Sequence, residues 1–159
     1  MDIPVATSAE APLAMWRTGL FWLQSLASLA LRVALAVPFY RSGLTKWDGF
    51  LSLAPTTTFL FENQFRLHIF GGEYAFPYPE LMATLSATGE IVFPVLLVLG
   101  LATRFAGLGI LGMTAIIFLT YPENWPNEAL PWAAMAVAIM AFGPGRIALD
   151  RLIAKAVKG

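Results

Sequence analysis

The chain alternates between long apolar stretches and short polar connections, and four of the stretches reach or approach the length of a membrane span. A bilayer core about 30 Å thick needs roughly 20 apolar residues in helix, and about 17 are sufficient. We expect spans at about residues 20–43, 81–102, 105–121 and 129–143. Only a few residues separate the second span from the third, so these two helices are predicted to be antiparallel neighbours. The pattern as a whole predicts an all-α, integral membrane four-helix bundle.

The connection between the first two predicted spans, residues 44–80, is long and unusually aromatic for a solvated linker. Within it, Phe59 to Phe70 has the pattern of a short amphipathic helix that ends at Gly71-Gly72. We expect residues 44–80 to form an aromatic-rich extracytoplasmic cap at the membrane surface, so that residues 1–159 make a single membrane domain. The aromatic residues of this connection are Phe50, Phe59, Phe61, Phe65, Phe70, Tyr74, Phe76 and Tyr78.

Basic residues indicate how the spans are oriented. With four spans, the N-terminus, the second connection and the C-terminus share one side of the membrane, and most of the basic residues fall on it. The excess of positive charge on that side predicts that both termini are cytoplasmic. The basic residues on that side are Arg17, Arg104, Arg146, Arg151, Lys155 and Lys158, against Arg41, Lys46 and Arg66 on the other.

Composition agrees with a membrane protein and narrows the chemistry. Of the 159 residues, 58% are hydrophobic and 13% are charged, compared with roughly 25% charged in an ordinary soluble domain. Ten Lys and Arg balance ten Asp and Glu, which leaves no basic footprint for a nucleic acid partner. The absence of Cys excludes thiol chemistry and Cys-ligated clusters, and a single His excludes bis-His haem. We therefore expect no metal site and no intrinsic cofactor.

Two opposite charges are predicted near the middle of the first two spans. Arg32 lies near the centre of the first span and Glu90 near the centre of the second. A lone charge at that depth costs about 2.5–3.5 kcal/mol on insertion scales, so we expect Arg32 and Glu90 to face inward as an ion pair. Such a pair offers a polar site to a proton, an anion or a quinone head group. In an equally good interpretation, the pair is purely structural and only fixes the register of the two helices.

A second cluster of charge follows at the end of the first span. Arg41 and Lys46 stand on the side that should be poor in positive charge. In a functional interpretation, they hold an anionic or carbonyl-bearing ligand beneath the aromatic cap. In a structural one, they snorkel to lipid head groups or pair with one of the carboxylates nearby, which are Asp48, Glu62 and Glu80.

An ordered set of motifs resembles the DoxX family over about Leu29 to Ile147. An Arg in the first span is followed by a G-x-x-K sequence (Gly43 to Lys46), a Glu in the second span and a Thr-Arg pair at the start of a glycine-rich third span. The resemblance implies a four-helix protein of the inner (cytoplasmic) membrane. Members are often membrane components of oxidoreductase systems, and one branch is the large subunit of a thiosulfate:quinone oxidoreductase. The polar positions that the resemblance carries over are Arg32, Lys46, Glu90 and Arg104.

Three functions are consistent with these observations. The first is a redox-linked membrane subunit that binds a quinone or a similar small ligand and works with a partner oxidoreductase. The second is a non-catalytic membrane anchor or assembly factor whose Arg32–Glu90 pair is structural, and the third is a small transporter, working as a homo-oligomer. No catalytic residue is assigned. The candidate ligand-binding residues are Arg32, Glu90, Lys46, Arg41 and Arg104.

Overall fold

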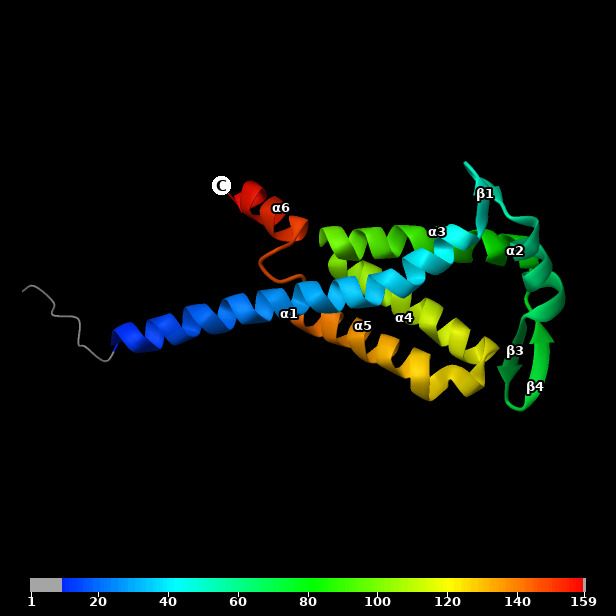
Figure 1. Ribbon diagram of the computed structural model, residues 1–159, viewed down its shortest axis with the longest axis horizontal. Coiled ribbons are helices and arrows are strands. Elements are labelled where there is room, and N and C mark those ends of the chain that lie inside the picture. Colours follow the sequence, from blue (N-terminus) through cyan, green and yellow to red (C-terminus); the bar gives the residue numbers. More distant parts are fainter. Residues whose placement is uncertain (1–9, 159) are drawn as a thin grey trace, which may run out of the picture.

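The computed structural model describes residues 10–158, and most of them are helical. In Figure 1, α1 and α4 run toward one end of the molecule, and α3 and α5 run back from it. The longest helices are α1 (Glu10–Thr45), α3 (Pro79–Leu99), α4 (Thr103–Thr120), α5 (Leu130–Phe142) and α6 (Leu149–Lys158).

Among residues 10–158, three helices are long and apolar enough to cross a membrane: Gly19–Thr45 of α1, Pro79–Leu99 and Thr103–Thr120. The fourth expected span overlaps α5, which has 13 residues, fewer than the roughly 17 that a span requires. A π-helix, η3 (Trp125–Ala129), leads directly into α5, and a 3-10 turn, η2 (Pro122–Asn124), precedes it. The structure is therefore that of a membrane protein with three candidate spanning helices.

The helices pack around an apolar core, and a smaller cluster of Phe61, Phe76 and Ala83 joins the α1–α3 connection to α3. Helix α1 contacts α3 and α5, and α4 contacts the same two helices from the other side. Phe39 of α1 meets Trp132 of α5 edge to face, with 5.0 Å between the ring centroids, a geometry that aromatic pairs favour. The buried apolar core residues are Leu35, Ala36, Phe39, Leu97, Ala106, Ile110, Ala136 and Ile139.

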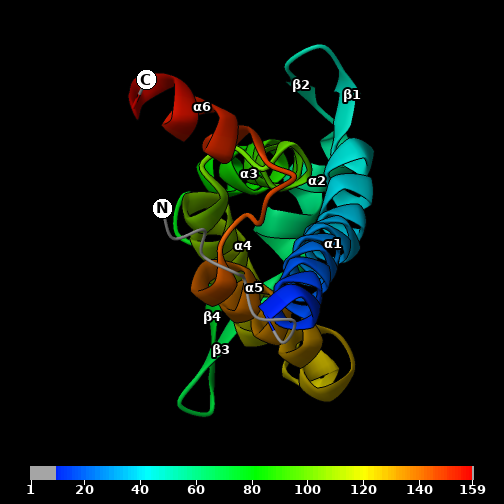
Figure 2. The ribbon, with the colours of Figure 1, turned by 90° about the vertical axis from the view of Figure 1, so that its left-hand side faces the viewer.

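The connection between α1 and α3 is not all-helical, and the all-α prediction is wrong there. It contains two antiparallel hairpins, β1 with β2 and β3 with β4, which project on opposite sides of the helices in Figures 1 and 2. The second hairpin pairs Arg66 with Ala75 and Ile69 with Gly72. The elements are β1 (Trp47–Gly49), β2 (Ser52–Leu53), α2 (Pro55–Phe59), η1 (Leu60–Gln64), β3 (Arg66–Ile69) and β4 (Gly72–Ala75).

The predicted amphipathic helix from Phe59 to Phe70 is also wrong. The helical segment begins earlier, at Pro55, and ends where Phe65 adopts an extended conformation (φ −72°, ψ 131°). Phe70 and Gly71 have φ of 50° and 80°. Positive φ at both central residues is the requirement of a tight two-residue hairpin turn. The glycines at this point therefore reverse a hairpin and do not end a helix.

The last helix, α6, was not expected from the sequence. A loop with two glycines in the left-handed region, Gly143 (φ 76°) and Gly145 (φ 74°), connects it to α5. In Figure 1, α6 lies toward the end of the molecule opposite to the hairpins. Its apolar residues are exposed and recur at helical spacing: Leu149, Leu152, Ile153 and Val157.

Candidate ligand-binding site

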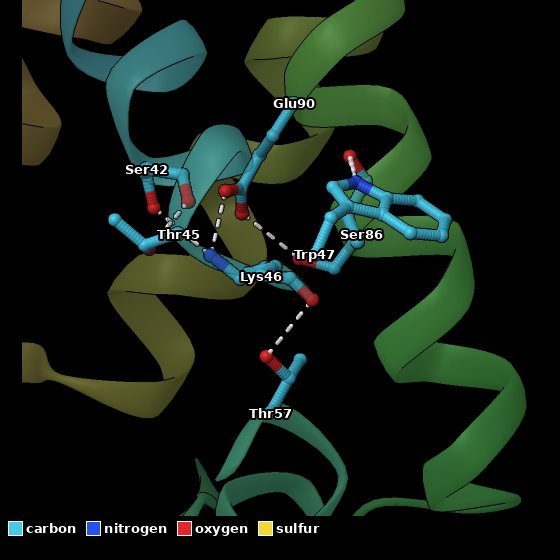
Figure 3. Close-up of polar contacts among 8 residues, drawn as sticks. Ser42, Thr45, Lys46, Trp47, Thr57, Ser86 and Glu90 are labelled. Carbon is cyan, nitrogen blue, oxygen red and sulfur yellow. Dashed lines mark hydrogen bonds and ion pairs between the residues drawn. The ribbon is translucent and has the colours of Figure 1, made fainter. Parts of the chain in front are cut away.

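The structure joins Glu90 to Lys46 in a buried ion pair. Glu90 lies in α3, its Oε2 atom is 2.6 Å from Nζ of Lys46, and only 5% of the residue is exposed. The hydroxyl of Ser86, one turn earlier in α3, donates to Oε1 of Glu90 (2.9 Å). Lys46 follows the last turn of α1 and also donates to Oγ of Ser42 (2.9 Å). Figure 3 shows the Lys46 ammonium between the Glu90 carboxylate and Ser42.

The first strand and α2 hold the backbone around Lys46 in place. The indole Nε1 of Trp47 donates to the carbonyl of Ala87 in α3 (3.4 Å), and the Thr57 hydroxyl donates to the carbonyl of Lys46 (3.3 Å). Thr57 is itself buried. The lysine is therefore fixed from both sides, by α3 and by the connection between α1 and α3.

Gly43 lets α1 approach α3 closely enough for this ion pair. A Cβ at Gly43 would lie 2.9 Å from the backbone carbonyl carbon of Glu90 and 2.9 Å from Cδ1 of Ile91. Such distances are shorter than any relaxed packing allows, so only glycine fits at this crossing. The contact between Gly43 and Glu90 sets the register of the two helices.

The predicted Arg32–Glu90 ion pair is therefore wrong. Both oxygens of the Glu90 carboxylate are held by Lys46 and Ser86. The prediction aligned the midpoints of the two spans, whereas the structure aligns Glu90 with Gly43. Eleven positions separate Gly43 from Arg32 in α1, which corresponds to about 16 Å along a helix. Arg32 consequently lies near the other end of α3.

Arg32 binds backbone carbonyls at the end of α3 and in the C-terminal loop. It is completely buried, Nη1 donates to the carbonyl of Leu97 (3.0 Å) and Nη2 to the carbonyl of Ile147 (2.5 Å). Its Nε has no hydrogen-bond partner among the described residues. A Cβ at Gly100, where φ is 67°, would lie 2.5 Å from Nη1 of Arg32. Arg32 therefore joins α1, the α3–α4 turn and the C-terminal loop.

Asp150 completes this junction by capping α4. Its carboxylate accepts hydrogen bonds from the backbone N–H of Ala102 (2.7 Å) and from the N–H and hydroxyl of Thr103 (both 3.0 Å). Burial tends to raise the pKa of the Asp150 carboxyl, but these hydrogen bonds and the charge of Arg32 outweigh it and hold the pKa below its ordinary value. The carboxylate is thus ionised at neutral pH. A negative charge stabilises the N-terminus of α4, because the helix dipole is positive there.

A cavity of about 760 Å³ opens beside the Lys46–Glu90 pair, and we call it the Lys46 cavity. Its walls come mainly from α3 and α4, with Ser42 and Lys46 at the end of α1 and Trp132 from α5. The volume lies within the range of roughly 300–1,000 Å³ that is typical of small-molecule sites. Its other polar lining residues are Ser86, Thr88, Glu90, Thr120, Tyr121, Asn124 and Glu128.

Aromatic side chains of the α1–α3 connection line the hairpin end of this cavity. Phe61 packs edge to face on Phe65 and Phe76, with ring centroids 5.0 and 5.3 Å apart, and Phe65 packs on Tyr121 at 5.8 Å. Burial, and then the charge of Glu123, raise the pKa of the Tyr121 phenol above its usual value. The phenol therefore keeps its proton at neutral pH and remains a hydrogen-bond donor.

The remaining candidate residues lie apart from the Lys46 cavity. Arg41 is exposed on α1, and Arg104 is exposed at the start of α4, with Nη2 3.9 Å from where a Cβ of Gly143 would stand. Neither residue lines the cavity, and ligand binding by them stays a prediction.

The spacing of serines along α1 and α3 indicates some of these contacts, although the sequence-based prediction did not include them. Ser42 and Ser86 each precede their charged partner by four residues, the spacing that places two side chains on one helix face. Ser25, Ser28 and Arg32 recur at similar spacing along α1, and all three are buried. Ser28 donates to the carbonyl of Gly143 (3.0 Å), so this polar face marks where the C-terminal loop docks.

These features define a class of protein: an integral membrane protein with a buried ion pair beside an apolar cavity between its spanning helices. The profile of the DoxX family matches residues 27–122, and the chain belongs to the DoxX family. The matched segment contains Arg32, Lys46 and Glu90 together with most of the Lys46 cavity. It ends before the loop that binds Arg32 and before Asp150.

One relative shares most of its length with this chain. An uncharacterized protein of Haemophilus influenzae is 28% identical over 139 residues, covering 80% of this chain and 83% of the relative. No solved structure matches the chain.

Proposed function

We propose that this protein is a redox-linked membrane subunit that binds a quinone, or a lipid-soluble ring ligand of similar size, in the Lys46 cavity. The observation that carries the proposal is a donor of Lys46 that no residue among 10–158 uses. An ammonium group has three N–H donors, and two of them bind Glu90 and Ser42. The third is available to a carbonyl oxygen in the cavity that Lys46 lines.

The walls of the cavity suit the rest of such a ligand. A quinone needs an apolar, aromatic surface for its ring and only a few fixed donors for its carbonyls. Phe61, Phe65 and Phe93 supply aromatic surface, and the phenol of Tyr121 supplies a second donor. Glu90 is hydrogen-bonded to Lys46 and holds the ammonium group at the wall of the cavity.

A partner would supply the redox centre. The chain contains no Cys and one His, so it cannot by itself ligate an iron–sulfur cluster through Cys or a bis-His haem. We propose that the partner is an oxidoreductase subunit and that this protein brings quinone to it in the membrane.

We further propose that the protein lies in the inner membrane and crosses it four times. Both termini are then in the cytoplasm. Helix η3 and α5 are continuous, and together they reach the minimum length of a span. The excess of basic residues at the end that holds the start of α1 and helix α6 supports this orientation.

The test uses Gly112, which lines the Lys46 cavity on α4. A Cβ at this position has nothing within 4 Å, so the backbone accepts a side chain there and Gly112→Leu places new volume at the cavity wall. We expect the parent protein to co-purify with quinone and to unfold at a higher temperature when a short-chain quinone is added. Ligand at about 100 times Kd stabilises by about 2.7 kcal/mol, and Gly112→Leu should remove this stabilisation. Solvent extraction and thermal unfolding in detergent measure both effects.

Gly19→Leu is the matched control. Gly19 lies in α1, is exposed, and a Cβ there also meets nothing within 4 Å. Both changes replace a helical glycine with leucine and gain about the same helix propensity, close to 1 kcal/mol. Gly19→Leu should bind quinone like the parent. The proposal fails if the parent carries no quinone and is not stabilised by it, or if Gly112→Leu binds as well as Gly19→Leu.

A non-catalytic anchor or assembly factor is the second candidate function. The observation that favours it is the completeness of the Glu90 contacts, because both carboxylate oxygens already have donors from the protein. In that case the Lys46–Glu90 pair only joins α1 to α3 and binds no ligand.

A further inference from the structure

A second cavity, of about 650 Å³, lies at the end of the molecule opposite to the Lys46 cavity, and we call it the Arg146 cavity. It is formed by the first half of α1, the end of α5, the following loop and the start of α6. We propose that it binds an anionic phospholipid, with the phosphate at Arg146 and Arg151 and an acyl chain along α1 and α5.

The charge of the cavity is the first argument. Arg146 and Arg151 line it, and among the described lining residues none is a carboxylate. Asp150 is adjacent in sequence, but its carboxylate oxygens cap α4 through Ala102 and Thr103. Two arginines that share a cavity repel each other unless an anion lies between them. A phosphate satisfies both, because the guanidinium fork matches its oxygens.

The orientation of Arg146 is the second argument. Its guanidinium carbon lies 5.4 Å from the ring centroid of Phe21 and 5.8 Å from that of Trp22. These cation–π contacts engage the guanidinium through its charge and do not use its N–H groups, which can bind a ligand. The aromatic rings therefore fix the arginine in place before an anion arrives.

The loop that carries Arg146 is built onto α1. Ser28 donates to the carbonyl of Gly143 (3.0 Å), and the N–H of Arg146 donates to Oγ of Ser25 (3.3 Å). Gly145, with φ of 74°, lies so close to α1 that a Cβ would come within 3.3 Å of Cβ of Ser28. The position of Arg146 thus follows from a fixed backbone and not from a free surface loop.

The remaining surface of the cavity distinguishes a lipid from a soluble anion. Phe21, Leu31, Ile139 and Phe142 give it an apolar wall, which a free phosphate leaves uncovered. Helix α6 begins at this cavity and exposes apolar residues along its length, as helices that lie in a membrane interface do. Basic pockets between membrane helices at this level are suited to anionic lipid head groups.

The experiment measures lipid binding to the full-length protein in detergent. Phosphatidylglycerol, phosphatidylcholine and inorganic phosphate are added separately, and lipid adducts by native mass spectrometry and the unfolding temperature are recorded. We expect phosphatidylglycerol to bind and stabilise more than the other two. Arg146→Gln and Arg151→Gln should each weaken it about fivefold and together about 25-fold, the usual effect of a basic residue at an anionic surface.

Three variants serve as controls. Arg66→Gln removes the same charge in β3, outside the Arg146 cavity and at the hairpin end of the molecule, and should bind phosphatidylglycerol like the parent. Ala27→Phe occupies the cavity, which Ala27 lines, and should weaken binding even where the arginine variants fold poorly. Ala30→Phe places the same bulk at an exposed position of α1 outside the cavity and should not.

Three results would overturn the proposal. One is equal stabilisation by phosphatidylglycerol and phosphatidylcholine, and another is unchanged phosphatidylglycerol affinity in the double arginine variant and in Ala27→Phe. The third is stabilisation by inorganic phosphate equal to that by phosphatidylglycerol, which would show an anion site without a lipid. Gly112→Leu should leave lipid binding intact, so the result does not depend on the quinone proposal.

Discussion

Arg32 and Asp150 show how a single charged side chain is made tolerable inside a membrane protein. A lone arginine at mid-membrane costs about 2.5–3.5 kcal/mol, yet Arg32 is fully buried. The cost of burying its charge is offset by hydrogen bonds to the backbone carbonyls of Leu97 and Ile147. The first of these lies at the end of α3, where the helix dipole is negative and favours a cation. Asp150 meets the positive end of α4 in the same way.

Replacing Asp150 with alanine should lower the stability of the protein in a pH-dependent manner. The variant loses the cap of α4, which typically contributes about 0.5–2 kcal/mol. The pKa of this carboxyl in the folded protein is held below the ordinary value of 3.8. Its contribution is therefore fully present above about pH 4 and is lost as the pH falls through the lowered pKa. Thermal unfolding of the parent and the variant over a pH series measures the difference.

Asp48→Ala is the control for this change. Asp48 is exposed in β1, so its removal should leave the unfolding temperature close to that of the parent at every pH. A gap between parent and Asp150→Ala that stays constant down to the most acidic pH would contradict the assignment of Asp150 as an ionised cap.

At the scale of elements, the Lys46–Glu90 pair fastens α1 to α3, and single and double replacements separate its structural and functional roles. Breaking a buried pair by removing one partner costs about 3–5 kcal/mol, whereas replacing both is often close to neutral. We expect Lys46→Met and Glu90→Gln each to unfold at a lower temperature than the parent and the double variant to recover most of the loss.

Quinone binding by the double variant then decides between the two candidate functions. If the cavity binds quinone through Lys46, the double variant folds but is no longer stabilised by quinone. If it folds and quinone still stabilises it as much as the parent, the pair is a helix lock and the ligand role of Lys46 is wrong.

The sequence predicted helices better than it predicted contacts. Long apolar runs located α3 and α4 because a span needs a continuous apolar stretch. The placement of Arg32 and Glu90 at one depth was wrong, because Arg32 lies beside the end of α3 and Glu90 near its middle. The partner of each was missed because helix register depends on one close contact, at Gly43, that composition does not reveal. The strands at 66–75 were missed because a two-residue turn can contain the same glycines that end helices. The strands at 47–53 were missed because their turn, Phe50-Leu51, has none of the usual turn residues.

At the scale of the whole molecule, the proposed orientation predicts that the hairpin end and α6 face opposite sides of the membrane. The chain has no Cys, so single cysteines report on each end without interference. Glu62 and Lys155 are exposed, and we expect Glu62→Cys to react with a membrane-impermeant thiol reagent in intact spheroplasts. Lys155→Cys should react only after the membrane is opened. Labelling of both from the same side would contradict four spans.

The order of the chain gives the Arg32 junction a consequence for biosynthesis. Arg32 is synthesised early, while the carbonyl of Ile147 and the carboxylate of Asp150 emerge more than a hundred residues later. Until the ribosome has made that last segment, the guanidinium has only part of its final set of acceptors, and α4 lacks its cap. Chains interrupted before the end of α5 therefore lack the Ile147 acceptor of Arg32 and the Asp150 cap of α4, and the junction can close only once synthesis is complete.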